Sequence, residues 1–266
     1  MQLNHRFLIL VLAFAILCVR FVYADDMDDV SPTGFNVGVG AWISPNFSGL
    51  SKSTGGTEMS LNHNLGFTTQ TLIVPELSYR WAHGQILTFN YQSYNQTAIT
   101  NLNVPESFQG ITFAAGARAM STTKLQWSNV NYELPVVYDH FPPHNYFLNA
   151  VAGIRFLNGS FTMSDAFGNT GTHSYFSTPL PEVGIHGRYR VHGGTDVELK
   201  LTGFRVGFVD STTWLYDIEA GVNQKLFDLL TLTGKYRFST FYDVDGNNNV
   251  FQYRFYGPEV DASAHF

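Results

Sequence analysis

The chain has a single cysteine, Cys18, and that residue lies in an N-terminal segment that we expect to be removed. A mature chain without thiols excludes a disulfide scaffold and thiolate metal sites. Acylation of Cys18 is the alternative, but the two residues before it are bulky, which disfavours a lipoprotein signal. A net charge of −6 leaves no basic footprint for nucleic acid.

Long apolar runs are also missing beyond the N-terminus. A helix that spans a bilayer needs about 20 apolar residues, and no stretch after residue 24 provides them. The apolar run from Phe7 to Val19 is itself too short, but the positive charge before it and Val22-Tyr23-Ala24 after it match a secretory signal peptide. We expect cleavage after Ala24. Any membrane residence must then come from β-structure.

What the chain does contain is a repeated alternation of apolar and polar residues with period two, which is typical of strands. In residues 182–191, for example, Val183 and Ile185 alternate with Glu182 and His186. The same alternation predicts ten strands, within residues 35–43, 73–81, 87–92, 129–136, 148–156, 182–191, 196–201, 216–225, 231–238 and 251–266. We therefore predict an all-β domain over residues 34–266, preceded by a signal peptide at 1–24 and a short segment at 25–33.

The polar faces of these strands carry ionisable residues of both signs. If the strands close into a barrel, these residues would line its interior, where buried charges need partners. We expect the acids and bases of adjacent strands to pair, Arg188 and Arg190 with Glu198 and Asp196, and Asp217 and Glu219 with Lys235 and Arg237. The predicted lumen set is Glu76, Arg80, Glu133, Arg155, Glu182, His186, Arg188, Arg190, Asp196, Glu198, Lys200, Asp217, Glu219, Lys225, Lys235 and Arg237, followed by Glu259 and Asp261.

The last stretch changes its phase. Phe251, Tyr253 and Phe255 put apolar residues on odd positions, whereas Val260 puts them on even positions. Because glycine tolerates unusual dihedral angles and proline gives no ladder hydrogen bond, this predicts a β-bulge at Gly257-Pro258.

The connections alternate between short links, such as residues 82–84, and longer polar ones, such as residues 44–71, which we interpret as a mobile cap. A soluble β-sandwich or barrel would show the same alternation of faces. Aromatic residues near the strand ends favour a membrane barrel, in which they form interfacial girdles. These residues are Tyr79, Trp81, Trp127, Tyr138, Tyr146, Tyr189 and Trp214.

A final strand that ends on the aromatic Phe266, after an export signal, resembles the Gram-negative outer-membrane β-barrel proteins of the small-barrel class, the OmpA-barrel and OmpW-like proteins. The resemblance implies an antiparallel transmembrane β-barrel of about ten strands, with eight or twelve as alternatives. It implies short periplasmic turns, longer extracellular loops and periplasmic termini. It also makes Phe266 part of the assembly signal, and makes the β-barrel assembly machinery, periplasmic chaperones, outer-membrane lipid and lipopolysaccharide the expected partners.

The sequence favours a structural or surface-contact role with a charge-filled lumen. The alternatives are a narrow channel for ions or small solutes and an outer-membrane enzyme of unrecognised type. We find no Asp pair with an Asp-His dyad as in the omptin proteases, and His173-Ser174 is only an adjacent pair. The acidic loop from Asp243 to Asn249 opens like a calcium loop but lacks the later ligands, so a hairpin turn is expected. We expect no catalytic residues, metal or cofactor.

Overall fold

The computed structural model describes residues 33–139, 145–176, 179–192, 194–208, 211–227 and 229–266. The predicted signal peptide and the segment 25–32 lie outside these residues. No helix long and apolar enough to cross a membrane occurs in the described part of the chain.

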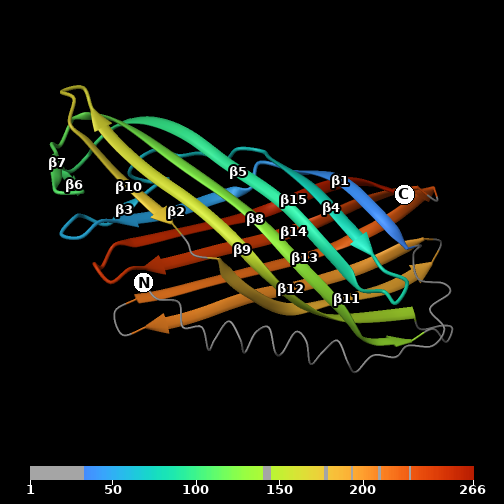
Figure 1. The fold of residues 1–266 in the computed structure, drawn as a ribbon. Helices are drawn as coiled ribbons and strands as arrows, with labels where there is room; N and C mark the ends of the chain where they lie inside the picture. Colours follow the sequence, from blue (N-terminus) through green and yellow to red (C-terminus); the bar gives the residue numbers. More distant parts are fainter. Residues whose placement is uncertain (1–32, 140–144, 177–178, 193, 209–210, 228) are drawn as a thin grey trace.

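The architecture is a closed antiparallel barrel, drawn in Figure 1. Each barrel strand pairs with its neighbour along the ring, and the first strand pairs with the last from Asn36 opposite His265 to Trp42 opposite Glu259. In ring order the barrel strands of the described chain are β1 (Gly34–Trp42), β4 (Leu72–Arg80), β5 (Ile86–Asn101), β8 (Arg118–Asp139), β9 (Asn145–Asp165), β11 (Leu180–His192), β12 (Thr195–Phe208), β13 (Ser211–Phe227), β14 (Leu230–Val244) and β15 (Val250–His265). All ten predicted strands are confirmed, as is the fold class.

The two ends of the barrel differ. We call the end where β1 begins and β15 finishes the base, and the opposite end, beyond Trp42 in β1, the head. Connections at the base are short, as between β4 and β5. At the head the chain forms additional short strands: β2 (Asn46–Lys52), β3 (Met59–Ser60), β6 (Glu106–Phe108), β7 (Ile111–Phe113) and β10 (Thr170–Phe176).

The segment 44–71, expected to be a polar mobile cap, is instead part of the folded head. Its β2 pairs with the head end of β15, from Asn46 opposite Tyr256 to Lys52 opposite Val250. Leu61 and Leu65 are fully buried. The Ser/Thr/Gly-rich composition concealed these few apolar residues, which are spaced for packing inside the head.

Nearer the base, the barrel is apolar outside and charged inside. Val39, Ile73 and Val260 point outward and are 54%, 59% and 50% exposed, whereas Arg155 and Glu182 point inward and are 1% exposed. We call the outward apolar surface the belt. An exposed apolar surface around the whole ring, over a charged interior, is the pattern of a barrel that faces lipid.

The head shows the opposite pattern. In the belt part of β8, the outward residue Val130 is apolar and the inward residue Glu133 is charged. Closer to the head the inward residues Leu125 and Trp127 are apolar and buried, while the outward residue Lys124 is charged and exposed. The same change occurs on β5, β9 and β15. The barrel therefore passes from apolar outside to apolar inside at one height. Trp127, predicted to lie in an interfacial girdle, is 1% exposed and belongs to the interior of the head.

The shift of apolar residues from odd to even positions in β15 marks the passage from head to belt, and it is not a bulge. Phe251, Tyr253 and Phe255 are fully buried, and so, on the same face, is Glu259. The register with β14 continues without a shift from Val250 to Ala264. The predicted bulge at Gly257-Pro258 is therefore wrong. Register shifts occur instead near the base, between Pro135 and Val137, between Arg190 and His192, and between Lys225 and Phe227.

Candidate functional site: the barrel lumen

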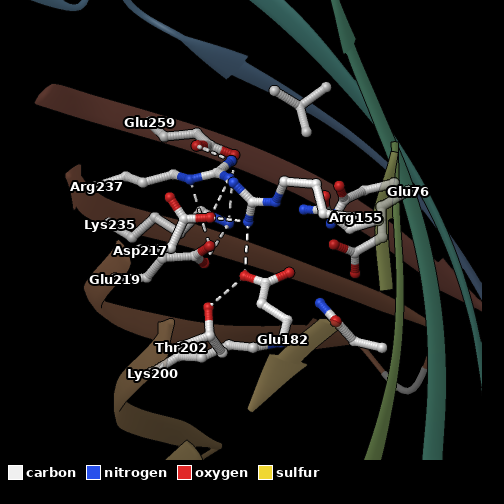
Figure 2. Close-up of a pocket in the computed structure, with 14 residues that line it drawn as sticks. Glu76, Arg155, Glu182, Lys200, Thr202, Asp217, Glu219, Lys235, Arg237 and Glu259 are labelled. Carbon is white, nitrogen blue, oxygen red and sulfur yellow. Dashed lines mark hydrogen bonds and ion pairs between the residues drawn. The ribbon is translucent and has the colours of Figure 1, made fainter. Parts of the chain in front are cut away.

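Arg155 is at the centre of one group of charges in the lumen (Figure 2). It extends from β9, and its Nη2 donates to Glu182 Oε1 on β11 at 2.8 Å and to a carboxylate oxygen of Asp217 on β13. Thr202 donates its hydroxyl proton to the same oxygen of Glu182 at 2.7 Å. The Arg155 side chain therefore ties three strands together across the lumen.

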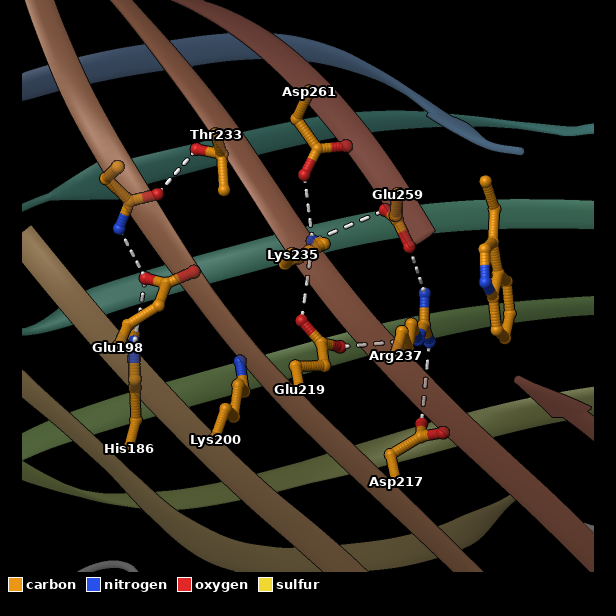
Figure 3. A network of polar contacts seen from close by, with 12 residues as sticks. His186, Glu198, Lys200, Asp217, Glu219, Thr233, Lys235, Arg237, Glu259 and Asp261 are labelled. Carbon is orange, nitrogen blue, oxygen red and sulfur yellow. Dashed lines mark hydrogen bonds and ion pairs between the residues drawn. The ribbon is translucent and has the colours of Figure 1, made fainter. Parts of the chain in front are cut away.

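A second group surrounds two bases on β14 (Figure 3). Lys235 Nζ lies 3.4 Å from Glu219 Oε2, 3.3 Å from Glu259 Oε1 and 3.0 Å from Asp261 Oδ2. Arg237 lies 3.4 Å from Glu219 Oε1 and 3.6 Å from Glu259 Oε2. Arg237 also lies 3.5 Å from Asp217, which links this group to that of Arg155.

A third group lies closer to the base and contains the buried His186. Its Nδ1 is 2.8 Å from Glu133 Oε2, and its Nε2 is 3.4 Å from Glu198 Oε2. Lys200 Nζ donates to the other oxygen of Glu133 at 2.8 Å. Asn223 donates to Glu198 at 2.6 Å. Acids and bases thus compensate one another at this level too, as buried charges require.

The predicted lumen residues are distributed as follows. Buried are Glu133, Arg155, Glu182, His186, Asp196, Asp217, Arg237 and Glu259; partly buried are Glu76, Arg80, Arg188, Arg190, Glu198, Lys200, Glu219, Lys235 and Asp261; Lys225 is exposed. Arg190 pairs with Asp196 at 2.9 Å. The expected pair of Arg188 with Glu198 does not form, because Glu198 is held by His186 and Asn223. What this set of residues does remains a prediction.

A cavity lies between the charged groups and is lined by residues of both signs, including Glu76 and Lys200 (Figure 2). Its volume is about 30 Å³, which leaves room for about two water molecules. Asn131 Oδ1 and Glu182 Oε2 are buried without a hydrogen-bond partner in the described structure, so they suit bound water. A cavity of this size does not admit an organic solute.

The sequence reasoning missed the aromatic core that fills the head. The Phe255 ring is packed between Phe47 at 4.9 Å, Tyr94 at 5.2 Å and Trp127 at 5.8 Å between centroids. Arg237 Cζ lies 4.9 Å from the ring centre of Trp42 and so connects the charges to the aromatic core. The sequence did contain a signal for this core, because the apolar residues of several strands change from one face of the strand to the other at the same height.

The head contains no arrangement that identifies catalysis or calcium binding among its described residues. Asp245 Oδ1 accepts hydrogen bonds from the backbone of Asn247 and Asn249, and the Asn249 amide donates to Oδ2. Asp165 has the same contacts with its own turn, and the hydrogen bond from the Asn169 side chain lowers the pKa of Asp165. Both carboxylates therefore close hairpin turns, and for the loop of Asp245 this is the interpretation the sequence favoured over a calcium loop. No metal-binding group of His, Asp and Glu occurs among the described residues.

No protein-family model matches the chain, and no curated protein matches its sequence. The outer membrane protease OmpT from Escherichia coli superimposes with a TM-score of 0.56 at 10% identity, covering 91% of this chain and 100% of OmpT. The translocator domain of the autotransporter NalP from Neisseria meningitidis gives 0.44 at 11% identity over 90% of each chain. Ail of Yersinia pestis gives 0.36 at 11% identity, covering 88% of this chain and 100% of Ail.

The closed ten-strand ring and the superposition on OmpT define the class: the chain has the fold of the small outer-membrane β-barrels, as the resemblance predicted. The similarity to OmpT is one of fold. At 10% identity it extends to the fold and not to the protease activity. The expected absence of catalytic residues therefore stays a prediction.

Proposed function

We propose that this chain is an integral outer-membrane protein with a closed lumen and a structural or surface-contact role. The observation that carries the proposal is the inversion between the belt and the head. A belt with apolar residues outside suits lipid, and a head with an apolar core inside suits water. The head is then a folded platform outside the membrane, where contacts with other molecules take place.

Closure of the lumen rests on two layers in series. The first is the ion-paired layer of Arg155, Lys235 and Arg237, whose remaining cavity holds about two water molecules. The second is the aromatic core around Phe255, whose ring is fully buried. A solute would have to displace both layers. The short connections at the base and the extended head support periplasmic termini and an extracellular head.

The same proposal includes the assembly route and the surroundings. Periplasmic chaperones and the β-barrel assembly machinery would deliver the chain, with Phe266 as part of the signal. Lipid and lipopolysaccharide would then cover the belt.

Single-channel conductance of the refolded chain 25–266 in planar bilayers tests the closure. One variant opens the ionic layer with Arg155→Ala, Lys235→Ala and Arg237→Ala; another opens the aromatic layer with Trp42→Ala, Trp127→Ala and Phe255→Ala. We expect no conductance steps from the unaltered chain or from either triple variant. The combined variant should conduct, because only then are both layers open.

The shift of folded barrels on unheated electrophoresis gels shows that each variant has folded before it is measured. Reproducible ion-selective steps from the unaltered chain would overturn the closed-lumen proposal and favour the narrow channel. Conductance from the ionic-layer variant alone would show that the aromatic core does not close the head.

A further inference from the structure

Positive side chains gather at the base of the barrel. Arg80 ends β4, Arg188 lies in the base half of β11, and Lys225 and His265 lie near the base ends of β13 and β15. The charges of Arg188, Glu133, Asp196 and Arg190 act on Arg80, and those of Arg80 and Lys225 act on His265. We call Arg80, Arg188, Lys225 and His265 the basic mouth.

The acids near this level are already engaged. Asp196 accepts from Arg190 Nε at 2.9 Å, and Glu198 accepts from Asn223 at 2.6 Å and contacts His186. Among the described residues, neither Arg80 nor Arg188 has a carboxylate within ion-pair distance. Arg188 Nε is buried without a hydrogen-bond partner. A partly buried guanidinium without a partner is costly, so the mouth is suited to an anionic ligand.

The first barrel strand begins at this mouth. Gly34, the first residue of β1, pairs with Arg80 across the ladder. A Cβ on Gly34 would come within 3.2 Å of His265 Nε2, so the chain passes directly beside two residues of the mouth. The segment before it reads Asp-Asp-Met-Asp-Asp from residue 25 to residue 29 and contains no base up to Gly34.

We propose that the basic mouth is a binding site for carboxylates and that its occupant is the acidic segment Asp25–Asp29 of the same chain. Aspartates match the planar, bidentate preference of arginine. Nine residues span about 30 Å when extended, which is enough to cross the mouth of a ten-strand barrel. Covalent attachment gives the segment a high effective concentration at the mouth.

A spin label on the segment tests this directly, since the mature chain has no other thiol. Met27→Cys is labelled in the detergent-solubilised chain, after mass measurement has verified that it begins at Asp25. We expect an immobilised spectrum at about 10 mM salt, where the Debye length is about 30 Å, and its loss at about 1 M, where it is about 3 Å. Arg80→Gln with Arg188→Gln should abolish the immobilised component at low salt. Exchanging the four aspartates for asparagine should do the same.

The matched control is Arg118→Gln, which removes an exposed base at the head end of β8 and should leave the spectrum unchanged. The folded-barrel gel shift accompanies every variant. An equally mobile label in the unaltered chain and in the arginine variant would overturn the proposal. So would immobilisation that survives both the arginine changes and high salt. A mobile label in the unaltered chain, together with binding of inorganic phosphate that is lost in the arginine variant, would overturn the proposal and assign the mouth to a diffusible anion.

Discussion

At the scale of single residues, the lumen depends on glycines as much as on charges. Gly40 faces Asp261 across the ladder between β1 and β15. A Cβ on Gly40 would collide with Asp261 Oδ1 and lie 3.2 Å from Glu259 Oε1. Gly153 leaves similar room for the side chain of Asn131. Small residues on the inner face thus make the space that large paired side chains fill.

Gly40→Ala should therefore destabilise the barrel. The added methyl group displaces Asp261 from its position 3.0 Å from Lys235, and overpacking of this kind costs about 1–3 kcal/mol. We expect a lower urea midpoint for unfolding from lipid vesicles, followed by the gel shift. Gly234→Ala is the control, because a Cβ there has no heavy atom within 4 Å. Equal midpoints for the two variants would contradict the role assigned to Gly40.

At the scale of strands, period two predicts which residues share a face but not which face is inside. Leu125, Trp127 and Val130 belong to one strand, yet the first two point into the head and the third to the outside of the belt. Which face lies inside depends on whether that part of the strand is surrounded by water or by lipid, and the local sequence does not encode this. The same ambiguity led to the predicted bulge at Gly257-Pro258.

The charged lumen was predictable in membership and less so in pairing. Arg237 and Asp217 approach as adjacent strands suggest, but Arg155 reaches Asp217 from a strand that is not its neighbour. Contacts across the lumen depend on barrel diameter and on strand stagger, which no single strand encodes. Arg188 stands opposite Glu198 in the ladder between β11 and β12, but Glu198 is engaged by His186 from the same strand as Arg188, a choice that the register alone does not predict.

The orientation of β15 gives the element-scale prediction. Phe255→Ala should cost about 3–5 kcal/mol, as expected for emptying a packed aromatic site. Near-ultraviolet circular dichroism should weaken in parallel, because Phe255 packs against Trp127 and Tyr253. Gln252→Ala, on the opposite face of β15, is the control and should change neither signal. A small effect of Phe255→Ala, equal to that of the control, would indicate that the Phe255 ring faces the outer surface and not the core of the head.

At the scale of the whole molecule, the barrel is closed by residues far apart in the chain. β1 and β15 form a ladder from Asn36 to Trp42, and beyond it Phe266 N donates to Phe35 O at 2.8 Å while Phe35 N donates to Phe266 O at 3.0 Å. The Phe266 side chain is 72% exposed. The backbone of Phe266 therefore contributes to closure of the barrel, whereas its exposed ring is not packed inside the barrel.

The backbone of Phe266 can therefore be tested for its part in barrel closure separately from the ring, which is proposed to act in assembly. Deleting Phe266 removes two backbone hydrogen bonds, worth about 0.5–1.5 kcal/mol each, and should lower the urea midpoint of the refolded barrel slightly. Phe266→Ala keeps both bonds and should leave that midpoint unchanged. In cells, however, both variants should accumulate less in the outer membrane, since both lack the exposed ring proposed as the assembly signal. Normal outer-membrane levels of Phe266→Ala would remove the ring from the signal, and a lowered midpoint for that variant would instead make the ring structural.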